Sequence, residues 1–136
     1  MNDEKLNLIE DRVGKRARVK AKERAILVGV DLGFGDENQL WTTEESMKEL
    51  ASLADTAGVQ IIETLIQKRA KPDPKFYIGK GKTEEIRELV RETGAQVVLF
   101  NDELRPAQAR NLEEKLGTKI VDRTQLIMDI FAQRAQ

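Results

Sequence analysis

The sequence predicts an α/β fold in which about four parallel strands form one sheet with helices on both faces. Three consecutive segments each show a helical pattern, a terminal glycine and then a short β-branched run. They are preceded by a continuous apolar run, AILVGVDL, which is typical of a strand buried on both faces. Strands that alternate with helices need crossover connections, and such connections make the sheet parallel.

The expected strands and the helices between them can be placed along the chain. A glycine after each helical segment, at Gly58, Gly94 and Gly117, suits the left-handed turn that ends many helices. The strands are expected at residues 25–32, 59–66, 96–101 and 118–122.

Capping residues mark the expected helix starts. Thr42 or Thr43, and Thr83, can accept a hydrogen bond from a free N–H group of the first helical turn. Pro106 suits the first position of a helix, because the N–H group that proline lacks has no partner there. Trp41, the only tryptophan, is expected to pack against the helix that follows it.

The chain is expected to have three parts. Residues 1–22 form a basic arm that is flexible or partly helical, and residues 23–122 form the α/β domain. Residues 123–136 begin a helical linker, in which Ile127, Ile130 and Phe131 are expected to share one face and pack against the sheet or a neighbouring chain. This helix shows no stop signal, so we expect it to be truncated from a longer helical segment.

The composition excludes several kinds of site. The 136 residues include no cysteine and no histidine, which removes disulfides, thiolate metal sites, histidine bases and most zinc sites. No apolar run reaches the roughly 18 residues of a membrane span, and the N-terminus lacks the apolar stretch of a signal peptide. An intracellular location fits this composition.

Two basic segments contrast with an otherwise acidic chain. The net charge is −1, yet residues 12–24 and 68–82 together hold thirteen Lys and Arg against two acidic residues. The rest of the chain has ten basic and 22 acidic residues. Such segments suit a polyanionic partner, and they also suit solvated charge that only keeps the protein in solution.

The second basic segment contains FYIGKGKT at residues 76–83, which looks like a phosphate-binding loop. A Walker A loop needs a glycine directly after a strand, with four residues between it and Gly-Lys-Thr, but Phe76 stands there and KPDPK precedes it. A dinucleotide fingerprint fails because Glu84 replaces its third glycine. Tyr-Ile-Gly also occurs in a family of nucleases, but the Gly-Ile-Tyr element that those nucleases carry upstream is missing from this sequence. None of these motifs is complete.

The loop can still contact phosphate in other ways. Its glycines permit close approach of the backbone, the helix expected from about Thr83 offers free N–H groups, and Tyr77 can stack on a base. The alternative is a tight turn in which glycine only provides a positive φ. As a hypothesis, the candidate RNA- or phosphate-binding residues are Lys68, Arg69, Lys71, Lys75, Tyr77, Gly79, Lys80, Gly81 and Lys82.

Polar residues are expected beyond the carboxyl ends of the strands, where open parallel sheets bind ligands. Asp31, Asn101, Asp102 and Asp122 stand there and could hold Mg²⁺ for phosphoryl transfer. Helix capping and turn formation are the favoured roles for such residues. No catalytic residue and no metal ligand is therefore predicted.

Several segments together resemble the N-terminal domain of the HflX family of GTPases. The likeness covers about residues 23–136 in the family's order, with one departure at Arg105, where the family often has a serine that caps the next helix. The segments that carry the resemblance are ERAILVGV, YIGKGK, FNDEL, PAQ and DRTQLIMDIFAQRA.

The resemblance implies a cytoplasmic protein that binds the large ribosomal subunit and separates stalled or idle ribosomes. In this family the N-terminal domain is followed by a long helical segment and a Ras-like GTPase domain, which binds GTP and Mg²⁺. The motifs of that domain are missing from this sequence, so no cofactor is expected here, and the chain by itself is expected not to hydrolyse GTP.

The expected partners are ribosomal RNA and the family's helical and GTPase domains. The glycine loop then faces RNA rather than GTP. The alternatives are a module that binds a nucleotide such as ATP, and a regulatory docking domain for the GTPase domain.

Overall fold

The computed structural model describes residues 18–33 and 42–134. Trp41, residues 1–17 of the basic arm and the last two residues therefore lie outside the described part. Strands and helices alternate along the chain in the predicted order. They are β1 (Arg24–Asp31), α2 (Thr43–Thr56), β2 (Gln60–Lys68), α3 (Lys80–Thr93), β3 (Val97–Phe100), α4 (Pro106–Leu116), β4 (Lys119–Asp122) and α5 (Arg123–Arg134).

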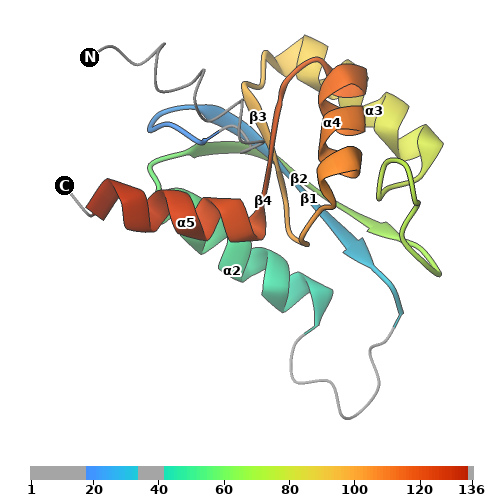
Figure 1. The fold of residues 1–136 in the computed structure, drawn as a ribbon, viewed down its shortest axis with the longest axis horizontal. Coiled ribbons are helices and arrows are strands. Elements are labelled where there is room, and N and C mark those ends of the chain that lie inside the picture. Colours follow the sequence, from blue (N-terminus) through green and yellow to red (C-terminus); the bar gives the residue numbers. More distant parts are fainter. Residues whose placement is uncertain (1–17, 34–41, 135–136) are drawn as a thin grey trace.

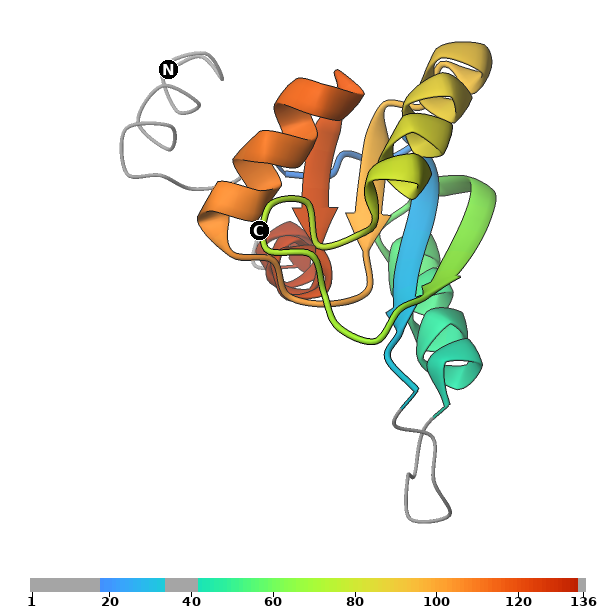
Figure 2. The same ribbon diagram turned by 90° about the vertical axis from the view of Figure 1, so that its right-hand side faces the viewer.

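The four strands form one parallel sheet in the order β2-β1-β3-β4, so the predicted α/β fold is confirmed. Helices α2 and α5 cover one face of the sheet, and α3 and α4 cover the other (Figure 1, Figure 2). In the two described ranges, no helix is long and apolar enough to cross a membrane.

Strand β1 lies at the centre and divides the apolar core into two halves. Its side chains alternate, because successive residues of a strand point to opposite faces. Ala25 and Leu27 pack with α2 and α5, whereas Ile26 and Val28 pack with α3 and α4, and all four are fully buried. Burial on both faces explains why this strand is an unbroken apolar run.

Most helix ends follow the predicted chemistry. The Thr42 hydroxyl accepts a hydrogen bond from the N–H group of Glu45, and Pro106 occupies the first turn of α4. Helices α3 and α4 end at Gly94 and Gly117, which both have φ of 68°. These expectations are confirmed.

The predicted start of α3 is wrong. The helix begins at Lys80, three residues before the expected cap at Thr83. Thr83 is fully buried inside the first turn, and its hydroxyl donates to the carbonyl of Gly79, 2.8 Å away. The glycine-rich sequence concealed this turn, because glycine is a poor helix former and was assigned to the loop.

The described end of the basic arm packs against the domain. Val19 is buried with the α2 and α5 core, and its N–H group donates to the Asp129 carboxylate of α5 at 2.9 Å. Burial raises the pKa of Asp129, whereas the hydrogen bond from Val19 lowers it. The N–H group of Lys22 also donates to the carbonyl of Gly58.

Helix α5 only partly fulfils the expectation of one packed face. Leu126 and Ile130 are buried and Ile127 is half-buried, but Phe131 is 68% exposed. Ile130 and Phe131 are neighbours on the helix and lie about 100° apart around its axis. The core can therefore cover the first without covering the second.

Stability measurements can test this arrangement. Replacement of the exposed ring by Phe131→Ala should change the free energy of unfolding by less than about 0.5 kcal/mol. Ile130→Ala should lower it by about 2–5 kcal/mol, because it leaves a cavity in the core. Urea unfolding of both variants checks the contrast, and equal losses would contradict the observed packing.

Candidate functional site

The segment between β2 and α3, residues 69–79, is a folded loop rather than a simple turn. Asp73 and Tyr77 exchange two backbone hydrogen bonds, of 3.0 and 2.9 Å. The Asp73 carboxylate accepts from the N–H groups of Lys75 and Phe76, which closes the tip of the loop. We call this segment the basic loop.

Side chains from two elements fasten the basic loop to the domain. Gln67 of β2 accepts a hydrogen bond from the N–H group of Gly79 at 2.8 Å. From α4, Gln108 donates to the carbonyl of Asp73 and Asn111 donates to that of Lys75, each at 3.1 Å. The loop is thus held at its tip and at its end.

Tyr77 provides a further attachment. Its hydroxyl faces the Asp102 carboxylate, which follows β3, and its ring packs against the core. Burial and the nearby Asp102 charge raise the pKa of the Tyr77 hydroxyl. Burial also raises the pKa of Asp102, while the polar interaction with Tyr77 and the charge of Arg123 lower it.

These contacts limit the base-stacking role that the sequence suggests for Tyr77. The side chain turns inward, and its backbone has φ of 65°, a left-handed conformation that is uncommon for residues other than glycine. A base-stacking role would have to use the part of the ring that the core leaves open.

The two loop glycines have different environments. A Cβ on Gly79 would lie 2.5 Å from a guanidinium nitrogen of Arg69, so this flexible side chain would have to move to admit it. Gly81 has neither a positive φ nor any atom within 4 Å of the place of a Cβ. The structure therefore needs no glycine at position 81, in the first turn of α3.

The cations of the candidate set differ in their contacts. Lys82 pairs with Glu85 at 3.2 Å, and the Lys75 ammonium lies 5.3 Å from the centre of the Phe76 ring. Among the residues that the structure describes, the remaining four make no ion pair with an acidic side chain. These four are Lys68, Arg69, Lys71 and Lys80.

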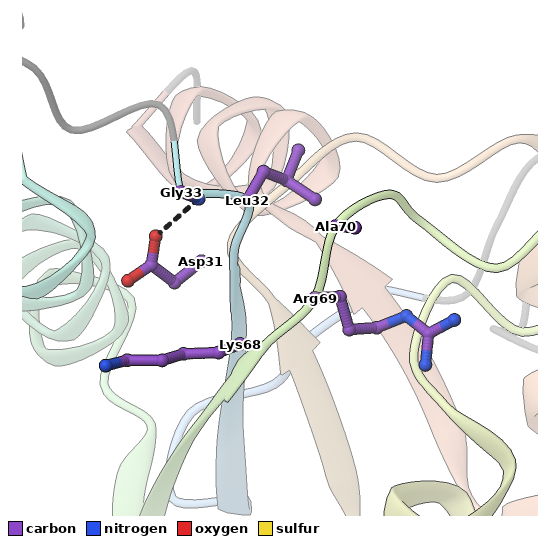
Figure 3. A pocket seen from close by; sticks show the side chains of 6 residues that line it. All are labelled: Asp31, Leu32, Gly33, Lys68, Arg69 and Ala70. Atoms are coloured by element: carbon purple, nitrogen blue, oxygen red, sulfur yellow. Dashed lines mark hydrogen bonds between the residues drawn. The ribbon is translucent and has the colours of Figure 1, made fainter.

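Two of these cations line an open hollow of about 440 Å³ at the carboxyl ends of β1 and β2. Lys68 extends toward the side of Asp31, whereas Arg69 points the other way, toward the basic loop (Figure 3). Arg69 donates from Nε to the carbonyl of Lys71. The hollow thus shares Arg69 with the start of the basic loop, and the two basic side chains beside it point to different sides of β2.

The basic residues of this edge oppose the usual charge preference of helices. A helix start carries partial positive charge, and a cation there costs about 0.3–1 kcal/mol. The first turns of α3 and α4 nevertheless contain no acidic residue, and Lys80, Lys82 and Arg105 stand at these two helix starts. Helix α2 follows the usual preference, with Glu44 and Glu45 in its first turn.

At the opposite edge of the sheet the cations suit the fold. The Arg24 guanidinium lies against Gly94 at the end of α3, where a helix carries partial negative charge. The length of β1, from Arg24 to Asp31, separates this described end of the first basic segment from the basic loop by about 23 Å. The described parts of the two basic segments thus do not form one continuous surface.

The polar residues after the strands act mainly in turns and caps, as favoured. Asp31 accepts from the N–H group of Gly33, and Asp122 accepts from those of Leu104 and Gln125. Asn101 instead donates to Ser46 and accepts from Arg123, at 2.9 and 2.7 Å. Within residues 18–33 and 42–134, no group of three acidic side chains could hold a metal ion.

Sequence reasoning missed the part that α4 plays. Arg105 was expected to weaken the cap of this helix, but Gln108 accepts a hydrogen bond from the Arg105 N–H group at 3.0 Å and replaces part of that cap. Glutamine three residues after a helix start is the signal that could have revealed this contact. The bond from Gln108 to Asp73 spans 35 residues and has no local signal.

The site is thus the basic carboxyl edge of a parallel α/β domain, formed by the basic loop and the starts of α3 and α4. A family model described as "GTP-binding GTPase N-terminal" matches residues 44–132. Since this match covers more than half of the chain, the chain belongs to that family, and the resemblance to HflX N-terminal domains is confirmed.

Curated relatives support this membership. The chain is 47% identical over 114 residues to the GTPase HflX of Alkalihalophilus pseudofirmus, covering 84% of the chain and 26% of the relative. It is 44% identical over 119 residues to the GTPase HflX of Escherichia coli, covering 88% and 26%. The chain therefore spans about a quarter of the length of these relatives.

Solved structures show the same fold. A GTP-binding protein from Sulfolobus solfataricus in complex with GDP superposes with a TM-score of 0.56 at 23% identity, covering 81% of this chain and 30% of that one. A variant of SsGBP reaches a TM-score of 0.62 at 22% identity, covering 84% and 33%.

The interaction between the Tyr77 hydroxyl and Asp102 can be tested by substitution. Tyr77→Phe should lower the free energy of unfolding by about 0.5–1.5 kcal/mol, because a half-buried carboxylate loses a polar partner. The interaction favours the charged form of Asp102, so the full loss of free energy should be seen at neutral pH. It should shrink as the pH falls through the pKa of Asp102 and the carboxyl becomes protonated.

Urea unfolding at several pH values checks this expectation, and Phe131→Ala serves as a control aromatic substitution on the exposed surface. A loss in Tyr77→Phe that is the same at every pH would contradict an interaction with the Asp102 carboxylate.

Proposed function

We propose that this chain is the RNA-binding N-terminal domain of an HflX-type GTPase and that its basic carboxyl edge contacts ribosomal RNA of the large subunit. The observation that carries the proposal is the concentration of cations at two helix starts, where they oppose the helix dipoles. Cations that destabilise these helix starts indicate a ligand that binds there and neutralises their charge. A polyanion is the ligand that fits.

The geometry of the edge supports phosphate contacts. Four of its cations make no ion pair with acidic side chains of the described residues, so binding need not first break such a pair. The first turn of α3 presents backbone N–H groups beside Lys80 and Lys82. The open space at Gly81 lets a phosphate approach that turn closely.

In the whole protein, this domain would direct a cytoplasmic GTPase to the large ribosomal subunit, where GTP-driven action splits or rescues ribosomes. GTP and Mg²⁺ would bind in the GTPase domain. The helical and GTPase domains are the further partners within the same protein. This assignment follows the family resemblance and the names of the relatives.

A second candidate function is that of a nucleotide-binding module, for example for ATP. The hollow of about 440 Å³ beside Lys68, Arg69 and Asp31 favours it, because ligands of parallel sheets bind beyond the strand ends. Saturable ATP binding that survives moderate salt would support this module. Steep salt dependence of binding to ribosomal subunits would support the RNA contact.

The phosphate contacts can be tested by cosedimentation with purified large ribosomal subunits across a salt series. Each lost contact flattens the plot of log affinity against log salt by about 0.7–0.9. Replacement of Lys80 and Lys82 by alanine should therefore weaken binding and lower the slope by about 1.5. The melting temperature should rise slightly, because the variant removes two cations that oppose the dipole of α3. Loss of the pair between Lys82 and Glu85 offsets part of this gain.

Lys48→Ala is a matched control, since Lys48 is an exposed lysine of α2 on the opposite face of the sheet. Its slope should equal that of the wild type. Equal binding and equal slopes for the wild type and the double lysine variant would mean that the glycine sequence forms only a helix start.

The chain by itself should not hydrolyse GTP above background. In a Walker A site the loop directly follows a strand, but here β2 ends at Lys68 and the folded basic loop intervenes before α3. Phosphate release under multiple-turnover conditions checks this expectation. GTP hydrolysis by the purified chain that disappears in Lys82→Ala would show that the loop is a catalytic phosphate site.

A further inference from the structure

Arg105 occupies a position where the fold gains nothing from an arginine. It precedes α4 in an extended conformation with φ of −69° and ψ of 147°, and its side chain makes no capping hydrogen bond. A guanidinium has no acceptor atom, so it cannot satisfy the free N–H groups of the first turn. Its positive charge also opposes the dipole of the helix that it precedes.

The side chain is exposed and makes no ion pair with an acidic side chain among the residues that the structure describes. Serine, threonine, aspartate or asparagine would stabilise the helix better at this position. Neither packing nor pairing in the described structure therefore accounts for the arginine.

One buried side chain connects Arg105 to the basic loop. Gln108 is 5% exposed, and its amide oxygen accepts from the N–H group of Arg105 at 3.0 Å. Its amide nitrogen donates to the carbonyl of Asp73 at 3.1 Å. Asn111, one helical turn further along, donates to the carbonyl of Lys75. The start of α4 and the tip of the basic loop are thus one structural unit.

We propose that Arg105 contacts RNA phosphate and that the binding surface of the basic loop continues through Gln108 onto the start of α4. This inference rests on the proposed RNA-binding function and adds a residue and a helix to its surface. The partner must present phosphate groups to the starts of two neighbouring helices, α3 and α4, at the same time. A backbone with closely spaced phosphates meets that requirement.

The test uses a substitution that should move stability and binding in opposite directions. Arg105→Ser creates the sequence Ser-Pro-Ala-Gln, a capping box in which the serine hydroxyl accepts from the helix while Gln108 keeps its present bond. The melting temperature of the chain should therefore rise. Binding to purified large ribosomal subunits should weaken, and the salt slope should fall by about 0.7–0.9.

If the affinities of wild type and variant converge near 1 M salt, this slope change corresponds to about sixfold weaker binding at 0.1 M salt. If Arg105 had only a structural role, the melting temperature and the affinity for ribosomal subunits would change in the same direction. A more stable variant would then bind at least as well as the wild type. Opposite changes are therefore specific to a contact with the ligand.

Two further variants complete the design. Arg105→Lys keeps the charge and should retain the wild-type slope. Arg91→Ser makes the same change as Arg105→Ser at an exposed arginine near the far end of α3, which pairs with Glu88, and should also retain the slope.

The inference is overturned if Arg105→Ser is more stable and binds with an unchanged slope, or if Arg105→Lys loses as much binding as the serine variant. The double lysine variant separates these failures from failure of the proposed function. If its slope changes while that of Arg105→Ser does not, only the extension onto α4 is wrong. If neither slope changes, the RNA-binding edge itself is wrong.

Discussion

The uniform direction of the four strands determines most of what this domain can do. Since every strand runs the same way, each helix that connects two strands must begin at the carboxyl edge of the sheet and end at the amino edge. The positive ends of the helix dipoles therefore gather at one edge and the negative ends at the other. A domain built in this way has an electrical polarity before any charged side chain is added.

Some charged side chains complement this polarity and others oppose it. Arg24 at the end of α3 and the acidic first turn of α2 complement the dipoles and stabilise the fold. Lys80, Lys82 and Arg105 add positive charge to helix ends that are already positive. The second arrangement weakens the isolated domain and strengthens the attraction of the starts of α3 and α4 for anions.

The sequence predicted the features that depend on local patterns. The apolar run of β1, the cap at Thr42 and the glycines that end α3 and α4 each have a cause within a few residues. The fold class follows from these alone, because alternating strands and helices leave few other topologies.

The remaining features depend on contacts between distant segments. Helix α3 extends back to Lys80, and Tyr77 is drawn inward by Asp102 from beyond β3. Phe131 shares its apolar character with buried Ile130 but faces solvent, which only the direction of α5 decides. The helical spacing of the sequence placed Ile130 and Phe131 on one broad apolar face. It could not show where the contact of that face with the core ends.

The fastening of the basic loop has a consequence for how it selects a partner. Hydrogen bonds from Gln67, Gln108 and Asn111 hold its backbone, and the inward-facing Tyr77 side chain beside Asp102 adds a contact from a third direction. A loop held in this way loses little conformational entropy when a ligand binds. It also keeps its cations at set separations and cannot adjust them to a differently spaced row of phosphates. Such a loop distinguishes one nucleic-acid shape from another by fit, without reading a single base.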